Sequence, residues 1–129
     1  MIYLDSSAIV KLVVPEPESE ALRQHLAPTG DWISSALARI EVLRALGRRN
    51  LPGESVRAAE RMLSRIALVP LDDRVLSAAA EVEPAGLRSL DAIHLATALS
   101  LFGLGSFVTY DQRLLASASA AGLRAMAPA

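Results

Sequence analysis

The sequence of 129 residues contains no cysteine and only one lysine, and aromatic residues make up 4% of it. Without cysteine the chain has no disulfide, no thiolate nucleophile and no cysteine-ligated zinc or iron–sulfur site, which fits a reducing compartment. The four aromatic residues other than Trp32 offer no obvious platform for stacking bases. The formal net charge is -1, so no overall basic field indicates a nucleic-acid partner.

The length predicts a single domain spanning residues 1–129. The hydrophobic fraction of 52% lies in the globular range. The first ten residues lack a basic segment and include Asp5, so they do not resemble a signal peptide. Residues 92–110 carry no charge, but Gly103 and Gly105 interrupt them, which indicates a buried helix followed by a strand rather than a membrane span. We expect a soluble cytoplasmic protein with no membrane association.

Short apolar runs alternate along the chain with longer helical patterns. Such alternation is typical of an α/β fold with a parallel sheet covered on both faces. Gly122 is the expected stop signal of the last helix. Strands are expected at 2–4, 32–34, 67–71, 106–110 and 123–127, and helices at 6–14, 17–26, 35–49, 54–66, 72–83, 87–103 and 111–122.

Two acidic residues come shortly after predicted strands. Asp5 follows the run Ile-Tyr-Leu, and Asp111 follows the run Phe-Val-Thr-Tyr. In open α/β sheets, ligands bind outside the carboxyl ends of the strands, so both carboxylates are candidate site residues. An alternative for each is an N-cap, because aspartate is a common cap where a strand leads into a helix.

Two further acids lie on helices with apolar flanks. For Glu41 the alternative is a surface ion pair with Arg44 or Arg48. Asp91 begins a helix that is apolar almost all round, and such helices are buried. A buried carboxylate is costly unless it is paired, hydrogen-bonded or metal-bound, so Asp91 requires a partner. Nine of the other ten acids are interpreted as solvated surface residues.

The four selected acids suggest a metal site if the fold brings them together. Carboxylates a few ångströms apart repel one another, and a hard divalent cation relieves that repulsion. An all-oxygen set of ligands without cysteine suits Mg²⁺ or Mn²⁺ better than zinc.

Four segments resemble the successive motifs of PIN-domain ribonucleases, specifically the VapC-type toxins of bacterial toxin–antitoxin pairs. The resemblance runs from Met1 to about Leu123. It implies a three-layer α/β/α sandwich with a mostly parallel sheet and metal-dependent cleavage of RNA, in which Ser6 and Thr109 support the acids. The segments are MIYLDSSAIVKLVVPE, ISSALARIEVLRAL, LRSLDAIHLATAL and FVTYDQRLLASASAAGL, and the catalytic and metal-binding residues implied are Asp5, Glu41, Asp91 and Asp111.

The resemblance also implies partners: RNA as substrate, a second copy of the chain in a homodimer, and a VapB-type antitoxin whose C-terminal segment lies across the active groove. Basic residues close to the four motifs are candidates for contacting RNA phosphates, with solubility and salt bridges as the alternative role. These candidates are Lys11, Arg39, Arg44, Arg88 and Arg113.

Other functions are less well supported by the residues. Ser6 and Ser7 lack the G-x-S-x-G context of a serine hydrolase, and the run GLGS lacks that of a dinucleotide site. A phosphatase of the haloacid dehalogenase type would need D-x-D after the first strand, and a phospho-receiver would need a lysine late in the chain. His94 is interpreted as a core histidine bonded to a backbone group. The remaining alternative is a PIN fold that binds RNA or a partner without cleaving RNA.

Overall fold

Five strands form one sheet in the order β3–β2–β1–β4–β5 in the computed structural model, which describes residues 1–129. Every neighbouring pair of strands is parallel. The predicted α/β class with a mostly parallel sheet is therefore confirmed. The strands are β1 (Ile2–Leu4), β2 (Trp32–Ser35), β3 (Ala67–Val69), β4 (Ser106–Val108) and β5 (Ala125–Met126).

Seven helices connect and cover the strands, and each predicted helix is present. Most end earlier than the patterns suggested; the helix expected over 72–83 stops at Ala80. Gly122 follows the last helix with a φ of 94°, which confirms it as the stop signal. No helix has both the length and the apolar character needed to cross a membrane. The helices are α1 (Ser6–Val13), α2 (Ser19–Leu26), α3 (Ala38–Arg48), α4 (Gly53–Ser64), α5 (Asp73–Ala80), α6 (Ser89–Leu99) and α7 (Gln112–Ala120).

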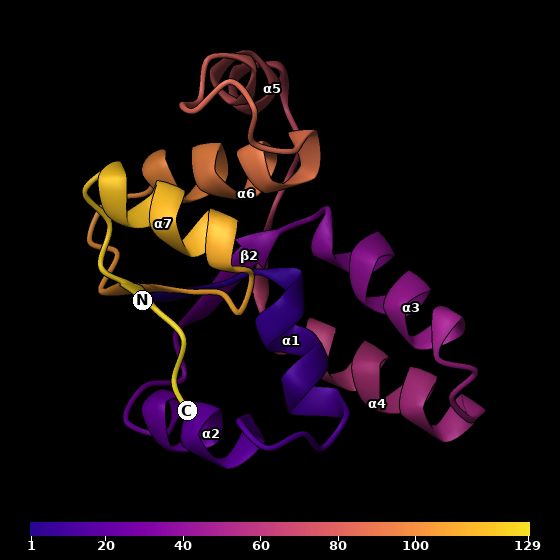
Figure 1. Cartoon of the computed structure of the whole chain (residues 1–129). Coiled ribbons are helices and arrows are strands. Elements are labelled where there is room, and N and C mark those ends of the chain that lie inside the picture. Colours follow the sequence, from indigo (N-terminus) through magenta and orange to yellow (C-terminus); the bar gives the residue numbers. More distant parts are fainter.

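The sheet has a hydrophobic core on each face. Side chains alternate along a strand, so Ile2 and Leu4 point to one face and Tyr3 to the other. Ile2 and Leu4 join the core formed with α1–α4. Tyr3 packs with Phe107 against Leu95 of α6 and against α7. Figure 1 shows α6 and α7 on one side of the sheet and α1 with α3 and α4 on the other, which gives the predicted three layers.

The order of the strands reverses between β1 and β4. The chain runs from β1 outward through β2 to β3, and then returns to the other side of β1 for β4 and β5. Leu4 at the end of β1 pairs with Val108 at the end of β4. Asp5 follows the first of these strands directly, and Asp111 lies three residues after the second. This reversal is the position at which open α/β sheets bind their ligands.

Candidate functional site

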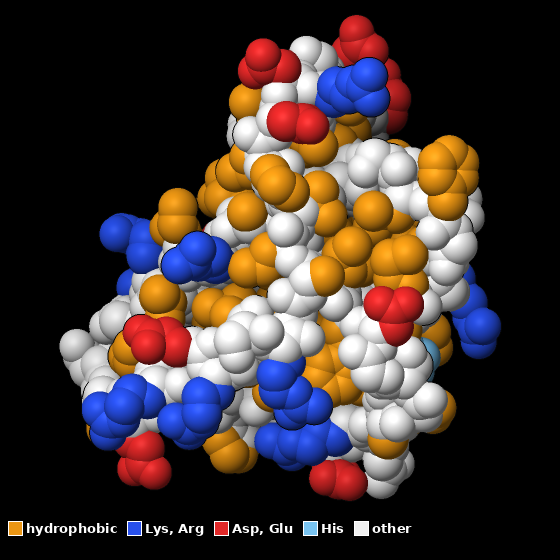
Figure 2. All heavy atoms as spheres, turned by 180° about the vertical axis from the view of Figure 1, so that it is seen from behind, with side chains coloured by type: hydrophobic (Ala, Val, Ile, Leu, Met, Phe, Trp, Pro, Cys, Tyr) orange, Lys and Arg blue, Asp and Glu red, His pale blue; other side chains and the backbone are white.

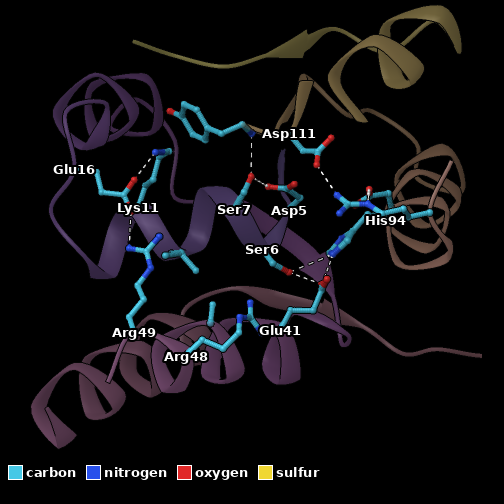
Figure 3. A pocket seen from close by; sticks show the side chains of 15 residues that line it. Asp5, Ser6, Ser7, Lys11, Glu16, Glu41, Arg48, Arg49, His94 and Asp111 are labelled. Atoms are coloured by element: carbon cyan, nitrogen blue, oxygen red, sulfur yellow. Dashed lines mark hydrogen bonds and ion pairs between the residues drawn. The ribbon is translucent and has the colours of Figure 1, made fainter. Parts of the chain in front are cut away.

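A pocket of about 390 Å³ lies at the carboxyl ends of β1 and β4, between α1, α3 and the start of α6. The four acids predicted from the sequence all line it, although they come from four separate segments. Figure 3 shows Asp5, Glu41 and Asp111 around its inner part. The residues that line it are Asp5, Ser6, Ser7, Val10, Lys11, Glu16, Glu41, Ala45, Arg48, Arg49, Arg88, Asp91, His94, Tyr110 and Asp111.

Asp5 is the most buried of the four acids, with 4% of its surface exposed. Its Oδ1 accepts hydrogen bonds from the Ser7 hydroxyl (2.6 Å) and from the backbone N–H of Ala8 (3.0 Å). Its Oδ2 accepts a hydrogen bond of 2.5 Å from the Thr109 hydroxyl. Burial raises the pKa of Asp5 above its ordinary value, although the charge of His94 and these hydrogen bonds act in the opposite direction. Asp5 is therefore both the N-cap of α1 and a residue of the pocket.

Asp111 has the same double role at the start of α7. Its Oδ1 accepts a hydrogen bond of 2.9 Å from the backbone N–H of Leu114, which caps the helix. Its own N–H donates to the Thr109 hydroxyl oxygen over 3.1 Å. Thr109 therefore links Asp111 to Asp5, as the resemblance implied for a supporting residue. For both acids the N-cap interpretation and the site interpretation are compatible.

Asp91 lies in the first turn of α6, and its partner is Arg88. The Arg88 guanidinium donates from Nε to Asp91 Oδ2 (3.1 Å) and from Nη2 to Asp111 Oδ2 (2.6 Å). Burial raises the pKa of Asp91 despite the opposing charge of Arg88, and the neighbouring charge of Asp111 raises it further. The Asp91 side chain is 13% exposed and that of Arg88 65% exposed. The partner that the sequence required is present in the chain itself, as an arginine.

Glu41, in the first turn of α3, makes no ion pair with Arg44 or Arg48. Its Oε1 lies 2.6 Å from Nε2 of His94 and accepts a hydrogen bond of 2.5 Å from the Ser6 hydroxyl. Burial acts to raise the pKa of Glu41, but the hydrogen bond and charge of His94 and the Ser6 hydroxyl bring it below its ordinary value. The resemblance implied a supporting role for Ser6, and this contact agrees with it.

The interpretation of His94 as a core histidine bonded to a backbone group was wrong in its second part. The ring is buried, with 1% of its surface exposed, but its hydrogen bonds go to side chains. Nδ1 lies 2.7 Å from the Tyr3 hydroxyl, and Nε2 faces Glu41. The sequence signal that could have identified it is its position three residues after Asp91, which places both on neighbouring turns of one helix.

The pocket contains only part of the predicted set of phosphate-binding residues. Lys11 and Arg88 line it, whereas Arg39, Arg44 and Arg113 do not. Lys11 is engaged by Glu16 (2.6 Å) and Glu18 (3.0 Å). Two arginines that were not among the candidates, Arg48 and Arg49, also line the pocket; Arg49 pairs with Glu16, and no ion pair engages Arg48.

The donor set of the pocket suits a hard divalent cation, because four carboxylates from four segments face one cavity and no thiolate is present. The hydrogen bonds of Glu41 reach only its Oε1, and those of Asp91 only its Oδ2, so one oxygen of each is available to a ligand. No three acidic or histidine side chains are grouped closely enough to hold one ion in this arrangement. Metal binding would thus require some of these side chains to move, and the hydrogen bonds of Arg88 to Asp91 and Asp111 would have to change.

Comparison with known proteins shows the family to which most of the chain belongs. The PIN domain model matches residues 2–119. Ribonuclease VapC46 of Mycobacterium tuberculosis is 52% identical over 129 residues, covering 98% of this chain and 97% of the relative. Ribonuclease VapC47 of the same species is 42% identical over 133 residues, with 99% and 97% covered.

Solved structures share the fold at lower sequence identity. The Mycobacterium tuberculosis toxin VapC20, described as cleaving the sarcin–ricin loop, superposes with a TM-score of 0.77 and 18% identity, covering 99% of this chain and all of the other. A toxin–antitoxin complex from Klebsiella pneumoniae gives a TM-score of 0.70 at 19% identity, with 90% and 91% covered.

Proposed function

Because this chain belongs to the PIN-domain family and is related along nearly its whole length to VapC ribonucleases, we propose that it is a toxin endoribonuclease that hydrolyses RNA phosphodiester bonds with a bound divalent metal, Mg²⁺ or Mn²⁺. The observation that carries the proposal is the meeting of four carboxylates, separated by up to 106 positions, in one pocket at the strand-order reversal. A structural role in the core would not require them to share one cavity with open access to solvent.

Each acid has a role suited to its surroundings. Asp5, held through both of its oxygens, is the most rigid of the four and is the proposed anchor of the metal. Asp91, whose burial is incompletely compensated by an exposed arginine, is the second proposed ligand. Glu41 keeps Oε2 available to bind metal or to orient the attacking water. Asp111 completes the set from the N-cap of α7.

When bound, the metal would supply activation of water and stabilisation of the leaving oxygen. The chain itself provides the environment for that chemistry. The Ser6 hydroxyl and His94 hold Glu41 Oε1, and Thr109 holds Asp5 relative to Asp111. Hydrolysis by an activated water is expected to leave a 5′-phosphate and a 3′-hydroxyl, so the RNA 2′-hydroxyl takes no part as a nucleophile.

A VapB-type antitoxin is the proposed protein partner. The relatives named VapC and the structural similarity to a toxin–antitoxin complex support it. The acidic inner part of the pocket suits a basic side chain, which would pair with the same carboxylates that Arg88 contacts. The antitoxin segment and the RNA would therefore compete for one groove.

A homodimer is the second proposed assembly. Exposed large hydrophobic side chains are concentrated between residues 71 and 102, with Ile40 as the exception. The upper half of the face seen in Figure 2, at the level of α5 and α6, exposes hydrophobic side chains, whereas Lys and Arg gather along its lower edge. Clustered exposed apolar groups are typical of protein interfaces. The exposed side chains in this range are Leu71, Leu76, Leu90, Leu99 and Phe102.

The test is cleavage of total RNA from the source cell in the presence of Mg²⁺, with the new 5′ ends mapped by sequencing. Asp5→Asn and Asp91→Asn remove one charge each from the pocket, and Asp73→Asn makes the same chemical change on an exposed turn of α5. Discrete cuts are expected for the wild type and for the Asp73 variant, and they should disappear in the other two variants and in EDTA.

The same experiment separates the alternative function. If the folded protein binds Mn²⁺ and RNA but produces no new 5′ ends, the ribonuclease proposal is wrong. The alternative, a catalytically inactive PIN fold that binds RNA or a partner, would then take its place. Cuts that persist in EDTA and in both pocket variants would contradict the metal-dependent mechanism.

A further inference from the structure

We infer that His94 is a positioning residue of the carboxylate site. The buried Tyr3 hydroxyl fixes the orientation of the His94 ring, and the ring in turn fixes the orientation of the Glu41 carboxylate. The inference rests on the proposed metal-dependent function. His94 has the two contacts that such a role needs. Nδ1 meets the Tyr3 hydroxyl at 2.7 Å, and Nε2 meets Glu41 Oε1 at 2.6 Å. The three residues come from β1, α6 and α3, so this Tyr3–His94–Glu41 relay connects one strand with two helices. Figure 3 shows the contact between His94 and Glu41 in the pocket.

Tyr3 is the rigid end of this relay. Its side chain is fully buried. Its ring stacks on that of Phe107 with centroids 5.0 Å apart and planes at 5°, and meets the ring of His94 edge-on at 82°. A phenol hydroxyl has an ordinary pKa of about 10, so Tyr3 keeps its proton at neutral pH. It is therefore a permanent donor at a fixed point of the core.

This donor selects the tautomer of His94. An ionised Glu41 can only accept hydrogen bonds, so Nε2 must carry a proton to bond with Oε1. In a neutral imidazole Nδ1 is then unprotonated and accepts the O–H of Tyr3. Both nitrogens of the buried ring are then hydrogen-bonded, and turning the ring over would break both bonds.

The consequence for the site concerns the two oxygens of Glu41. His94 and the Ser6 hydroxyl both bond to Oε1, and Ser6 Oγ lies 3.3 Å from Nε2. The hydrogen bonds of Glu41 thus end on one oxygen and leave Oε2 for the metal or its water. Partners of this kind, which orient a ligand from behind, typically account for about 10–100-fold in metal affinity.

Two amide variants separate the two contacts of the ring. Glutamine carries an N–H at about the position of Nε2, so His94→Gln keeps the donor to Glu41. Asparagine reaches only to about the position of Nδ1, so His94→Asn keeps a contact to Tyr3 and loses the one to Glu41. Both variants replace a buried ring by a neutral amide. Each is therefore the control for the other, and thermal unfolding measures whether the two variants lose similar stability.

The first measurement is Mn²⁺ affinity of the RNA-free protein, followed by electron paramagnetic resonance. The expected result is a Kd weakened about 10–100-fold in His94→Asn and by no more than about threefold in His94→Gln, with similar losses of Tm. Wild-type affinity in the Asn variant, or an equal loss in both variants, would overturn the positioning role while leaving the proposed function intact. A wild-type protein that binds no Mn²⁺ would overturn both.

Two readouts keep the inference testable if His94→Asn does not fold. Tyr3→Phe retains the histidine and removes the donor that selects its tautomer. Like His94→Gln it loses only the contact between Tyr3 and residue 94, so a Mn²⁺ affinity weakened by about threefold is expected; an unchanged affinity would contradict the relay. Nitrogen-15 NMR of the wild-type imidazole should show a proton on Nε2. A ring protonated on Nδ1 alone would contradict the proposed geometry.

Discussion

Arg88 donates a hydrogen bond of 2.6 Å from Nη2 to Oδ2 of Asp111, which joins the residue before α6 to the residue before α7. The same guanidinium bonds to Asp91 through Nε. One exposed cation thus neutralises two of the four pocket acids. No three acids are grouped as a metal site in this arrangement. If the pocket binds a divalent cation, as proposed, the cation would compete with the guanidinium for Asp91 and Asp111.

This competition predicts that Arg88→Gln binds Mn²⁺ more tightly than the wild type. Exposed ion pairs contribute little to stability, so the expected gain in affinity is small, at most about fivefold. Isothermal titration of the RNA-free protein measures it. Arg113→Gln removes an equal charge from an exposed position near Asp111 that lies outside the pocket lining and should leave the affinity unchanged. A weaker affinity in the Arg88 variant would mean that the arginine assists metal binding instead.

The cationic wall of the pocket predicts different roles for two arginines of α3. Arg48 lines the pocket and is engaged by no ion pair, whereas Arg44, also exposed, lies outside the lining. In an Asp5→Asn background, which is expected to prevent cleavage, Arg48→Gln should weaken binding of a single-stranded RNA. The slope of log K against log salt should fall by about 0.7, as expected for one lost phosphate contact.

Arg44→Gln is the matched control for that experiment, because it removes the same charge from the same helix. Its salt slope and its affinity should equal those of the Asp5→Asn parent. Equal effects of the two arginine variants would indicate a general loss of positive charge and not a contact in the pocket.

The link through Thr109 predicts a loss that depends on one hydroxyl group. Thr109 is fully buried, donates to Asp5 and accepts from the Asp111 N–H. Thr109→Val keeps the shape and removes both bonds. Leaving buried polar groups unpaired costs about 1–3 kcal/mol, and disturbing two acids should reduce cleavage about 10–100-fold. Thr109→Ser keeps the hydroxyl and should retain most of the activity; equal losses in both variants would assign the effect to packing.

The sequence allowed the fold to be predicted because its signals are local. The run Ile2–Leu4 is a short apolar segment followed by an N-cap, and each of the five predicted strands is present. The ends of the helices were less predictable: residues 81–83 continue a helical composition, but α5 stops at Ala80 before Pro84. The strand order β3–β2–β1–β4–β5 could not be read from the sequence, since it depends on packing between distant segments.

The site was predictable to the extent that its residues follow strands or interrupt apolar helices. Asp5 and Asp111 met the first condition and Asp91 the second. The role of His94 was missed because it depends on Tyr3, which is 91 positions away in the sequence and lies in the core between the sheet and α6. Arg48 could have been selected over Arg44, since it lies seven residues after Glu41 and so two helical turns along the same face.

Burial of Asp5 predicts that the site reduces the stability of the metal-free protein. The pKa of Asp5 is raised by burial above the ordinary value of 3.8. The folded state therefore holds the proton to higher pH than the unfolded state, and the free energy of unfolding falls as pH rises from about 3.8 through the folded pKa. Asp5→Asn removes this ionisation, because an amide carries no titratable proton. The variant can keep the hydrogen bonds, because its amide oxygen can accept from Ser7 and Ala8 and the Thr109 hydroxyl can turn to accept from its amide N–H.

At pH 7 in EDTA, Asp5→Asn is expected to be more stable than the wild type by about 1 kcal/mol, a rise of a few degrees in Tm. The difference should shrink as the pH falls through the folded pKa of Asp5 towards the ordinary value of 3.8, because the wild-type carboxyl regains its proton. Urea unfolding at several pH values measures both. Asp73→Asn, on an exposed turn, should show no such pH dependence. A variant that is less stable than the wild type at pH 7 would mean that the hydrogen bonds to the ionised carboxylate outweigh its burial, and that Asp5 stabilises the fold even without a cation.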